Sequence, residues 1–569
     1  MKKIKINLNG KEVFARPGEK LIDVIARNKI YVPTLCKNKH LDPAGACRLC
    51  VVEVENIPKL MASCSTPVRE GMVVKTHTSR VIKSRRVNIE LLLANHNKDC
   101  TSCAQNLNCK LQKYSKDLMI DEIRFEGEKR KSGVDNSSVS IKRDNSKCIL
   151  CGQCFRTCNE IQTVYAIGQQ NRGFQTKVAP PLNLSMAESS CVNCGQCVIA
   201  CPVGALSEQN NVREVANALS SGKILIAQTA PSIRATLGEL FGFKPGVSVT
   251  GKMVAALKEL GFSKVFDTDL AADITIVEEA TEFVKRFKNK KDLPMITTCC
   301  PAWIKFAEQY FFEQLNHMSS CRSPQAMMAS LIKTYYAEKN KIDPKDIIVV
   351  DIMPCTAKKY EVSRPEFRGE ADFVLTTVEL ARLIEQFNIN FKDLEDEDFD
   401  NPLGESSGAG VIFGRSGGVM EAALRTAADF ISDKNLKNIE YEDVRGLSYS
   451  KEASVKIGGE TIKICVVHTL GEARRIMNEI REGKCDYDFI EIMACYGGCI
   501  GGGGQPRFES DKILQKRMSA LAGEDENKKI RKSHLNPSLI KLYKEYLGEF
   551  GGKKAHKLLH TKYYEKESI

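Results

Sequence analysis

Three cysteine-bearing segments decide the fold of the C-terminal half of this chain: TTCCPAW at 297–303, MPCTAKKYE at 353–361 and EIMACYGGCIGGGGQ at 491–505. Each begins where a short, β-rich apolar run ends, and in an α/β sheet the carboxyl ends of strands are where sites are built. Four thiolates from separate strand ends can hold a 4Fe–4S cluster. We therefore expect a cluster bound by Cys300, Cys355, Cys495 and Cys499.

Length and cysteine content agree with a multidomain metalloprotein. The chain has 569 residues, enough for several domains, and 23 cysteines. In a chain of this length, clustered C-x-x-C spacings favour metal binding in a reducing compartment over a disulfide scaffold. The first ten residues alternate as a strand does and lack an apolar signal core, and no apolar run approaches the length of a membrane span. We expect a cytoplasmic protein without membrane attachment.

A first module is expected at 1–80. Residues 3–8 and 12–15, joined by Asn9 and Gly10, predict a β-hairpin, and a helix is expected near 21–28. The cysteines that follow, with GACRLCVVEV around the middle pair, are Cys36, Cys47, Cys50 and Cys64. Zinc also binds four cysteines, so the residue types alone leave zinc as an alternative.

A second, short module is expected at 81–126. Its motif is HNKDCTSCAQNLNC at 96–109. The candidate ligands are His96, Cys100, Cys103 and Cys109. One histidine with three cysteines suits zinc as well as an iron–sulfur cluster.

A third module, expected at 127–209, begins with a polar connector and then carries two C-x2-C-x2-C-x3-C runs. Only the second run is followed by proline, Pro202. This doubled spacing is typical of two-cluster bacterial ferredoxins, in which the fourth cysteine of each run binds the other cluster. The expected ligand sets are Cys148, Cys151, Cys154 with Cys201, and Cys191, Cys194, Cys197 with Cys158.

Residues 210–569 alternate strand-like runs with amphipathic stretches such as 254–260 and 375–387, which predicts α/β layers. The acidic stretch 394–400 is expected to be a solvated loop, and 536–548 an amphipathic helix. The histidines near this C-terminal helix are expected to be structural: His534, His556 and His560.

The three segments of the C-terminal half resemble the signature segments of iron-only (FeFe) hydrogenases, most of all the monomeric, ferredoxin-dependent clostridial type. The resemblance covers essentially the whole chain. It implies an H-cluster, in which a 4Fe–4S cubane is bridged by a cysteine to a di-iron subsite with CO, cyanide and a bridging dithiolate. It also implies a β-grasp 2Fe–2S domain, a His-ligated 4Fe–4S module, a two-cluster ferredoxin-like domain, and a two-lobed α/β catalytic domain with a C-terminal wrapping segment.

The resemblance also implies catalytic roles. Cys299 matches the terminal proton carrier, and a thiol near its free pKa can give and retake a proton. Glu279, Glu282 and Arg286 are spaced by three and seven residues on one helical face, which alone would indicate a solvated ion-pair stripe. They match the family's proton path, which also passes Ser319. Residues matching the surroundings of the subsite are Pro231, Ser232, Met353, Lys358 and Met493.

Two positions depart from the family pattern. Thr298 stands where the family usually has serine, and Cys321 stands where a small residue without a thiol is expected. Of the four cysteines outside the ligand sets, Cys465 and Cys485 are expected to behave as small buried hydrophobes.

The function that follows is reversible reduction of protons to H2 with electrons from reduced ferredoxin, through four accessory clusters: one 2Fe–2S and three 4Fe–4S. The net charge of +12 favours an acidic carrier, ferredoxin or flavodoxin, and no nucleic-acid motif accompanies it. Maturation proteins would supply the di-iron subsite. The alternatives are an electron-transfer subunit of the NADH–quinone reductase type and a hydrogenase-like iron–sulfur assembly or sensory protein. The sequence leaves open a nicotinamide-linked partner subunit.

Overall fold

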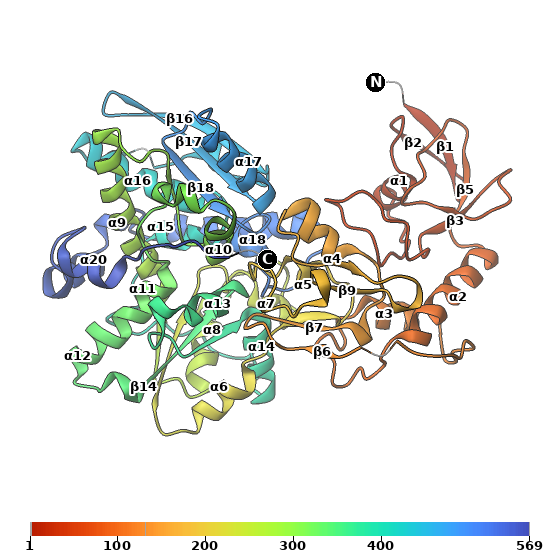
Figure 1. Ribbon diagram of the computed structural model, residues 1–569, viewed down its shortest axis with the longest axis horizontal. Helices are drawn as coiled ribbons and strands as arrows, with labels where there is room; N and C mark the ends of the chain where they lie inside the picture. Colours follow the sequence, from red (N-terminus) through yellow and green to blue (C-terminus); the bar gives the residue numbers. More distant parts are fainter. Residues whose placement is uncertain (1–2, 131, 438, 568–569) are drawn as a thin grey trace. The chain divides into compact units, whose positions relative to one another are not determined.

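The computed structural model describes residues 3–130, 132–437 and 439–567 (Figure 1). The chain divides into two compact units. The first comprises Met1–Ile161, Tyr165–Ser189 and Cys197–Ser207, and the second comprises Gln162–Val164, Ser190–Gln196 and Glu208–Ile569. Among the described residues, no helix has both the length and the apolar character of a membrane span.

The first unit opens with a five-stranded sheet in the order β2-β1-β5-β3-β4. The predicted hairpin is confirmed, because β1 and β2 pair antiparallel across Asn9 and Gly10, which both have positive φ as a tight hairpin turn requires. Helix α1 buries its apolar face against this sheet. The elements are β1 (Ile4–Leu8), β2 (Lys11–Ala15), α1 (Leu21–Arg27), β3 (Val51–Val54), β4 (Met61–Ala62) and β5 (Val73–Lys75).

Helices α2 (Ser79–Asn95) and α3 (Lys110–Asp117) follow. The buried Arg85 of α2 donates hydrogen bonds to the carbonyls of Leu49, Val51 and Thr76, and so anchors the helix on the first sheet. The rest of the unit is built from β6 (Val134–Asp135), β7 (Ile141–Asp144), α4 (Gln153–Arg156), a π-turn (Thr157–Ile161), β8 (Gly168–Gln170), β9 (Lys177–Ala179), α5 (Gln196–Ala200) and β10 (Leu206–Glu208).

The second unit contains two four-stranded sheets, as expected for a two-lobed α/β domain. The first sheet is entirely parallel, in the order β12-β11-β14-β15. Its strands are β11 (Ile224–Thr229), β12 (Lys264–Asp267), β14 (Ile347–Met353) and β15 (Phe373–Thr376). The second has the order β13-β18-β17-β16 and is parallel except for the β16–β17 hairpin. Its strands are β13 (Met295–Ile296), β16 (Ser450–Ile457), β17 (Glu460–His468) and β18 (Phe489–Met493).

Helix α9 (Thr268–Asn289) packs against both sheets (Figure 1). One side, including Ile274 and Val277, joins the core around β11 and β14, and another, including Ile276 and Phe283, joins the core around β17 and β18. Because apolar layers cover it on two sides, this helix also buries carboxyl side chains. The position of α9 therefore removes Glu279 from solvent.

The remaining helices surround the two sheets. They are α6 (Val212–Leu219), α7 (Leu237–Leu240), α8 (Thr250–Glu259), α10 (Pro301–Tyr310), α11 (Pro324–Leu331), α12 (Ala337–Asn340), α13 (Ala357–Ser363), α14 (Thr377–Gln386), α15 (Gly408–Val411), α16 (Gly418–Ser432), α17 (Leu470–Arg481), α18 (Asp511–Asn527), α19 (Pro537–Leu542) and α20 (Lys553–Leu559).

Two local predictions need correction. Leu375 belongs to β15, and α14 begins only at Thr377, because Thr376 and Glu379 form a capping box that fixes the helix start. The helix expected at 536–548 changes at Tyr543 from α19 into a π-helical turn that ends at Leu547. The acidic stretch 394–400 contains no helix or strand and is mostly exposed, which confirms the predicted loop.

Candidate active site

Four of the five cysteines in the signature segments, the expected cubane ligands, lie in loops that follow strands of both sheets. Cys355 follows β14 in the parallel sheet, whereas Cys495 follows β18 in the other sheet. Cys300 caps α10 after β13, and Cys499 opens a 3-10 turn that ends at Gly501. Burial raises the pKa of Cys355 to about 12, with a contribution from the nearby Cys300 thiol. The structure therefore brings thiols from separate segments together.

This group of thiols fits an iron–sulfur cluster. In the part of the chain that the structure describes, no disulfide bond joins Cys300, Cys355, Cys495 or Cys499 to another cysteine. Burial and the neighbouring thiols Cys355 and Cys300 raise the pKa of both Cys495 and Cys499. Thiolates so close together repel one another unless cations lie between them, and coordination to iron removes this cost.

A glycine run allows the cysteine loops to approach closely. A Cβ atom at Gly502 would lie 2.3 Å from the Pro354 carbonyl oxygen, and one at Gly503 would lie 2.6 Å from the Cα of Gly195. Real Cβ atoms do not tolerate such distances, so only glycine fits at these positions.

The segment 190–196 packs directly on these loops within the second unit. Thr356 donates a hydrogen bond to the Asn193 carbonyl at 2.7 Å, and Gln196 donates to the Gly501 carbonyl at 3.0 Å. The thiol of Cys495 lies 4.0 Å from the carbonyl oxygen of Cys194. Two cysteines of the predicted two-cluster module, Cys191 and Cys194, thus lie on a segment in contact with the signature loops.

Cys299 lies between the cysteine group and a buried carboxyl. Burial, followed by the charges of Cys499, Cys300 and Glu279, raises its pKa well above the ordinary value of a thiol. The Lys358 ammonium donates a hydrogen bond to the Cys299 carbonyl at 3.3 Å.

The predicted relay residues continue from Cys299 toward the surface. Burial raises the pKa of Glu279 to about 8, and the nearby Ser319 hydroxyl opposes this shift only in part. Ser319 lies beside β13, since its N–H donates to the Ile296 carbonyl at 2.8 Å. Glu282, one turn further along α9, is partly exposed and accepts a hydrogen bond from Arg286 at 2.5 Å. The structure thus brings the relay residues into one series, from a buried end to a partly exposed end.

Residues expected around the subsite are buried and held by partners that the sequence did not suggest. Ser232 accepts a hydrogen bond from Gln505 at 3.2 Å. The Lys358 ammonium donates to Glu361 and to Ser323, both at 2.7 Å. Also buried are Pro231, Met353 and Met493. Ser323 carries no spacing signal, whereas Glu361 stands three residues after Lys358, the spacing of an ion pair on one helix, and Gln505 ends the glycine run.

The two departures from the family pattern contact each other. The Thr298 hydroxyl donates to the Cys321 carbonyl at 2.7 Å, so the threonine holds the loop that carries the unexpected thiol. Cys465 is buried in β17 as expected, whereas Cys485, which was also expected to be buried, is only partly buried. His534 is partly buried and bonds Asp429, which agrees with a structural role, but His560 has polar contacts that the sequence did not predict.

The cysteines of the first module form a compact, buried group. The Sγ atoms of Cys36 and Cys47 lie 3.4 Å apart, and this contact lowers the pKa of Cys36 to about 6. Cys50 and Cys64 form a second such pair, in which the contact lowers the pKa of Cys64. Four buried thiols grouped in this way fit a 2Fe–2S cluster.

His96 has a buried Nδ1 atom without a hydrogen-bond partner among the described residues. Burial lowers its pKa, which keeps the imidazole neutral and able to bind a metal. Cys103 lies close to Gly204, because a Cβ atom added to Gly204 would be 2.3 Å from the Sγ of Cys103. An unpartnered imidazole nitrogen fits the expected ligand set of this module.

In the third module, the structure groups the first expected ligand set. Burial and the charges of Cys201, Cys148 and Cys151 raise the pKa of Cys154 well above the ordinary value. Gln153 donates a hydrogen bond to the Leu35 carbonyl at 2.5 Å, which links this group to the first module. The other expected set is divided between the units: Cys158 and Cys197 belong to the first unit, and Cys191 and Cys194 to the second.

Comparison with known families agrees with these sites. Residues 223–503 match "Iron only hydrogenase large subunit, C-terminal domain", and 511–566 match "Iron hydrogenase small subunit". Residues 1–79 match a 2Fe-2S iron-sulfur cluster binding domain, 85–124 the NADH-ubiquinone oxidoreductase-G iron-sulfur binding region, and 122–205 a 4Fe-4S dicluster domain. The chain belongs to the iron-only (FeFe) hydrogenases, oxidoreductases that interconvert protons and H2 and here carry accessory iron–sulfur domains.

Two curated relatives align over essentially the whole chain. This chain is 45% identical to the NADP-reducing hydrogenase subunit HndD of Solidesulfovibrio fructosivorans, with 100% of both chains covered. It is 40% identical to iron hydrogenase 1 of Clostridium pasteurianum, covering 98% of this chain and 99% of that protein. A solved variant of the [FeFe]-hydrogenase HydA1 from Chlamydomonas reinhardtii aligns with a TM-score of 0.57 and 38% identity, covering 63% of this chain and 99% of that one.

Proposed function

We propose that this chain is a cytoplasmic ferredoxin hydrogenase that reversibly reduces protons to H2. Its H-cluster, when bound, supplies the di-iron site at which protons and electrons combine. The proposed ligands of the cubane are Cys300, Cys355, Cys495 and Cys499. Beside the signature loops, the buried Ser232 and Lys358 would donate hydrogen bonds to the cyanides of the subsite, with Pro231, Met353 and Met493 packed around them.

One observation carries the catalytic assignment: a series of proton-bearing side chains ends at the cysteine group. In this proposal Cys299 is the last proton donor and Glu279 holds the next proton. Ser319 passes protons between Glu279 and Glu282. Arg286 keeps Glu282 oriented near the surface. A buried carboxyl with a pKa near 8 is protonated at neutral pH and can still release its proton, which suits a relay. An iron–sulfur assembly or sensory protein has no need of such a series.

The decisive test combines infrared spectroscopy with an activity assay. Protein matured with the di-iron subsite is expected to show bands of metal-bound CO and cyanide and to evolve H2 from a chemical reductant. An electron-transfer subunit or an assembly protein would show neither. Absence of these bands after maturation of protein with a full cubane would overturn the proposal.

We also propose the domain limits 1–80, 81–126, 127–209 and 210–569, with four accessory clusters in the first three domains. The 2Fe–2S cluster would be bound by Cys36, Cys47, Cys50 and Cys64, and the His-ligated 4Fe–4S cluster by His96, Cys100, Cys103 and Cys109. The two ferredoxin-like clusters would be bound by Cys148, Cys151, Cys154, Cys201 and by Cys191, Cys194, Cys197, Cys158. Contact of segment 190–196 with the signature loops supports electron entry through the last of these clusters.

Iron content tests this assignment. The anaerobically matured protein is expected to contain about 20 iron atoms per chain, from one 2Fe–2S cluster, four 4Fe–4S clusters including the cubane, and the two-iron subsite. Iron analysis together with EPR of the reduced protein measures this number. Only two or three clusters in fully active protein would contradict it.

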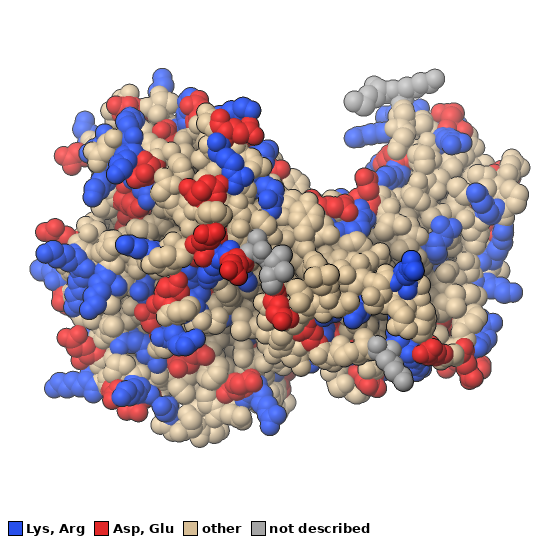
Figure 2. Space-filling view, viewed as in Figure 1, with Lys and Arg blue, Asp and Glu red and all other residues tan. Residues whose placement is uncertain are grey.

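The electron carrier is proposed to be an acidic ferredoxin or flavodoxin. The net charge is +12. Exposed lysines lie along the last turn of α9 and just after it, from Lys285 to Lys291. Arg85 is buried and is therefore excluded from any docking surface. On the face shown in Figure 2, basic and acidic side chains are interspersed, so the attraction would be distributed over the surface.

Salt dependence tests this carrier. We expect ferredoxin-driven H2 evolution to slow as ionic strength rises, because screening weakens attraction between oppositely charged proteins. Evolution driven by a small neutral reductant serves as the control and is expected to change little. Ferredoxin-driven rates that do not vary with salt would contradict an electrostatic docking step.

A second electron partner has one specific observation in its favour. HndD, which aligns over its full length, is a subunit of an NADP-reducing hydrogenase. A nicotinamide-linked partner subunit is therefore the alternative to free ferredoxin. Purification of the native complex distinguishes them: co-purification of a flavin-containing subunit with NADP reduction by H2 would favour the alternative.

A further inference from the structure

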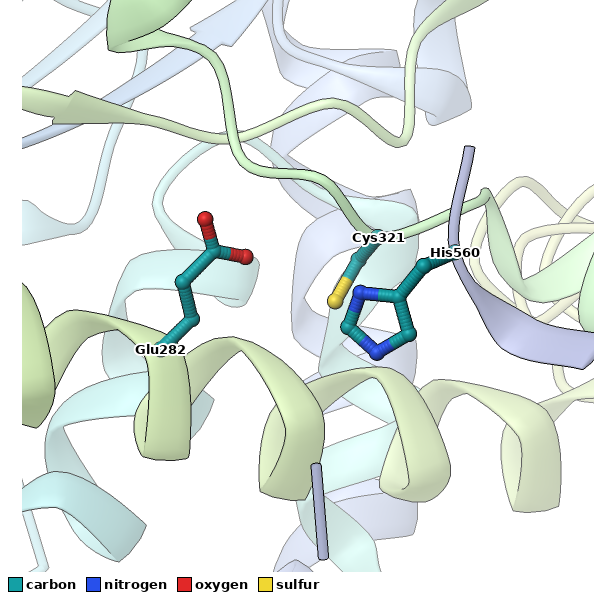
Figure 3. A group of neighbouring side chains, drawn as sticks. All are labelled: Glu282, Cys321 and His560. Carbon is teal, nitrogen blue, oxygen red and sulfur yellow. The ribbon is translucent and has the colours of Figure 1, made fainter. Parts of the chain in front are cut away.

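Outside the cysteine clusters, the structure brings together three potential metal ligands, Glu282, Cys321 and His560. One ligand atom of each residue lies within 4.8 Å of the other two. The three ligand groups are a carboxylate, a thiol and an imidazole. Figure 3 shows the three side chains converging from helix α9, from the loop that precedes α11, and from the C-terminal segment. Cys321 and His560 are buried and Glu282 is partly exposed, so an ion could enter beside the carboxylate.

Backbone contacts hold two of these ligands in register. Cys321 and His560 form an antiparallel β-bridge. On either side, the N–H of Arg322 donates to the Leu559 carbonyl and the N–H of Thr561 donates to the Ser320 carbonyl, both at 2.8 Å. Ligands on a fixed backbone frame lose little conformational freedom when an ion binds.

The histidine has the surroundings of a metal ligand. Its Nε2 lies 2.8 Å from the Glu278 carboxylate, and the N–H of Gly551 fixes that carboxylate at 2.9 Å. Metal-binding histidines commonly donate their second ring N–H to a carboxylate, which directs the other nitrogen toward the metal. In Figure 3 the other ring nitrogen, Nδ1, faces the Cys321 thiol. It is 2.8 Å from the Ser320 hydroxyl, a contact that an ion would replace.

The ligand set selects a borderline transition ion. Sulfur, imidazole nitrogen and one carboxylate oxygen suit Zn²⁺, whereas Mg²⁺ and Ca²⁺ prefer oxygen ligands. Bonds of about 2.0–2.3 Å would require the ligand atoms to approach one another by about 1 Å, within the reach of side-chain rotation. One carboxylate oxygen of Glu282 could keep its hydrogen bond from Arg286. The other oxygen could bind the ion in place of its hydrogen bond from the Ser320 hydroxyl. The thiol proton of Cys321 would leave to solvent, and water would fill the fourth position.

We propose that Glu282, Cys321 and His560 form a Zn²⁺ site whose occupancy closes the outer end of the proton relay. The inhibitory effect rests on the role proposed above for Glu282, because a carboxylate bound to zinc can no longer pass protons. The existence of the site does not rest on that role. Cys321 is the ligand that departs from the family pattern, so sensitivity to zinc would be a property of this chain.

The site is tested by zinc binding to the anaerobic holoenzyme. We expect one more equivalent of tightly bound zinc in the natural protein than in Cys321→Ala, and zinc-edge X-ray absorption that shows one sulfur among nitrogen and oxygen ligands. Cys465→Ala, which removes another buried free thiol, is the matched control and is expected to bind zinc as the natural protein does. Equal zinc binding without a sulfur ligand in all three proteins would overturn the site.

The inhibitory effect is tested separately. Each protein's H2 evolution with zinc is divided by its own rate without zinc, and infrared spectra and iron content verify that the clusters are intact. At saturating zinc the natural protein and Cys465→Ala are expected to slow by at least about tenfold, and Cys321→Ala to slow by less than about twofold. Sulfur-bound zinc with unchanged turnover would support the site and overturn both the inhibition and the relay role of Glu282. Equal inhibition of natural protein and Cys321→Ala would overturn the proposed mechanism of inhibition.

Discussion

Replacing Cys299 by alanine is expected to lower H2 evolution by at least about 10²-fold, the usual scale for loss of a positioned acid. The thiol lies near Cys300, Cys499 and Glu279, so its loss would interrupt the proposed relay at its innermost step. Water is a poor substitute for a thiol that packs against the apolar core around β17 and β18. The four proposed cubane ligands are unchanged, so the cluster is expected to assemble normally.

The measurement pairs the rate of H2 evolution with infrared spectra of the same sample. Intact CO and cyanide bands with a collapsed rate would separate chemistry from assembly. Cys465→Ala is the control, because it removes a buried free thiol in β17 from the same catalytic domain. Near-normal turnover of Cys299→Ala with intact bands would refute the role of this thiol.

Local chemistry explains which features could be predicted from sequence. The spacing of ligands such as Cys148, Cys151 and Cys154 is set by cluster geometry over a few residues. It can therefore be recognised in the sequence before the fold is known. The Asn9–Gly10 turn was predictable for the same reason, since positive φ at two successive residues restricts the residue types. The families that match 1–79 and 122–205 confirm a 2Fe–2S domain and a 4Fe–4S dicluster domain, whereas the individual ligand residues stay predictions.

Features that depend on distant contacts could not be predicted. The spacing of Glu279 and Glu282 indicated a solvated stripe, but α9 packs against both sheets and buries Glu279. His560 was expected to be structural, yet the fold returns the C-terminal segment to the loop that carries Cys321. Lys358 was predicted to lie at the site, whereas its partner Ser323 follows only from how α11 and α13 pack.

Replacing Glu279 by glutamine is expected to reduce H2 evolution by about 10²-fold, less severely than loss of Cys299. Glutamine keeps the size and polarity of the side chain but cannot release and regain a proton. Water can bypass an inner relay group more easily than the terminal donor, which is why the smaller effect is expected. Activity close to that of the natural protein, with intact infrared bands, would exclude Glu279 from the relay.

The same substitution has a pH signature that a purely structural carboxyl of ordinary pKa would not give. Burial raises the pKa of Glu279 from 4.5 to about 8, so its protonated form is favoured in the folded state. The stability this group contributes is complete below about pH 4.5 and falls as the pH rises to about 8, by up to about 1.4 kcal/mol per pH unit, because only the unfolded chain ionises in that window. Glu279→Gln cannot ionise, so its melting temperature relative to the natural protein is expected to rise between pH 5 and pH 8. A melting difference that stays constant over this range would show that Glu279 titrates normally, and a normally titrating carboxylate could not hold the proton that the relay requires at neutral pH.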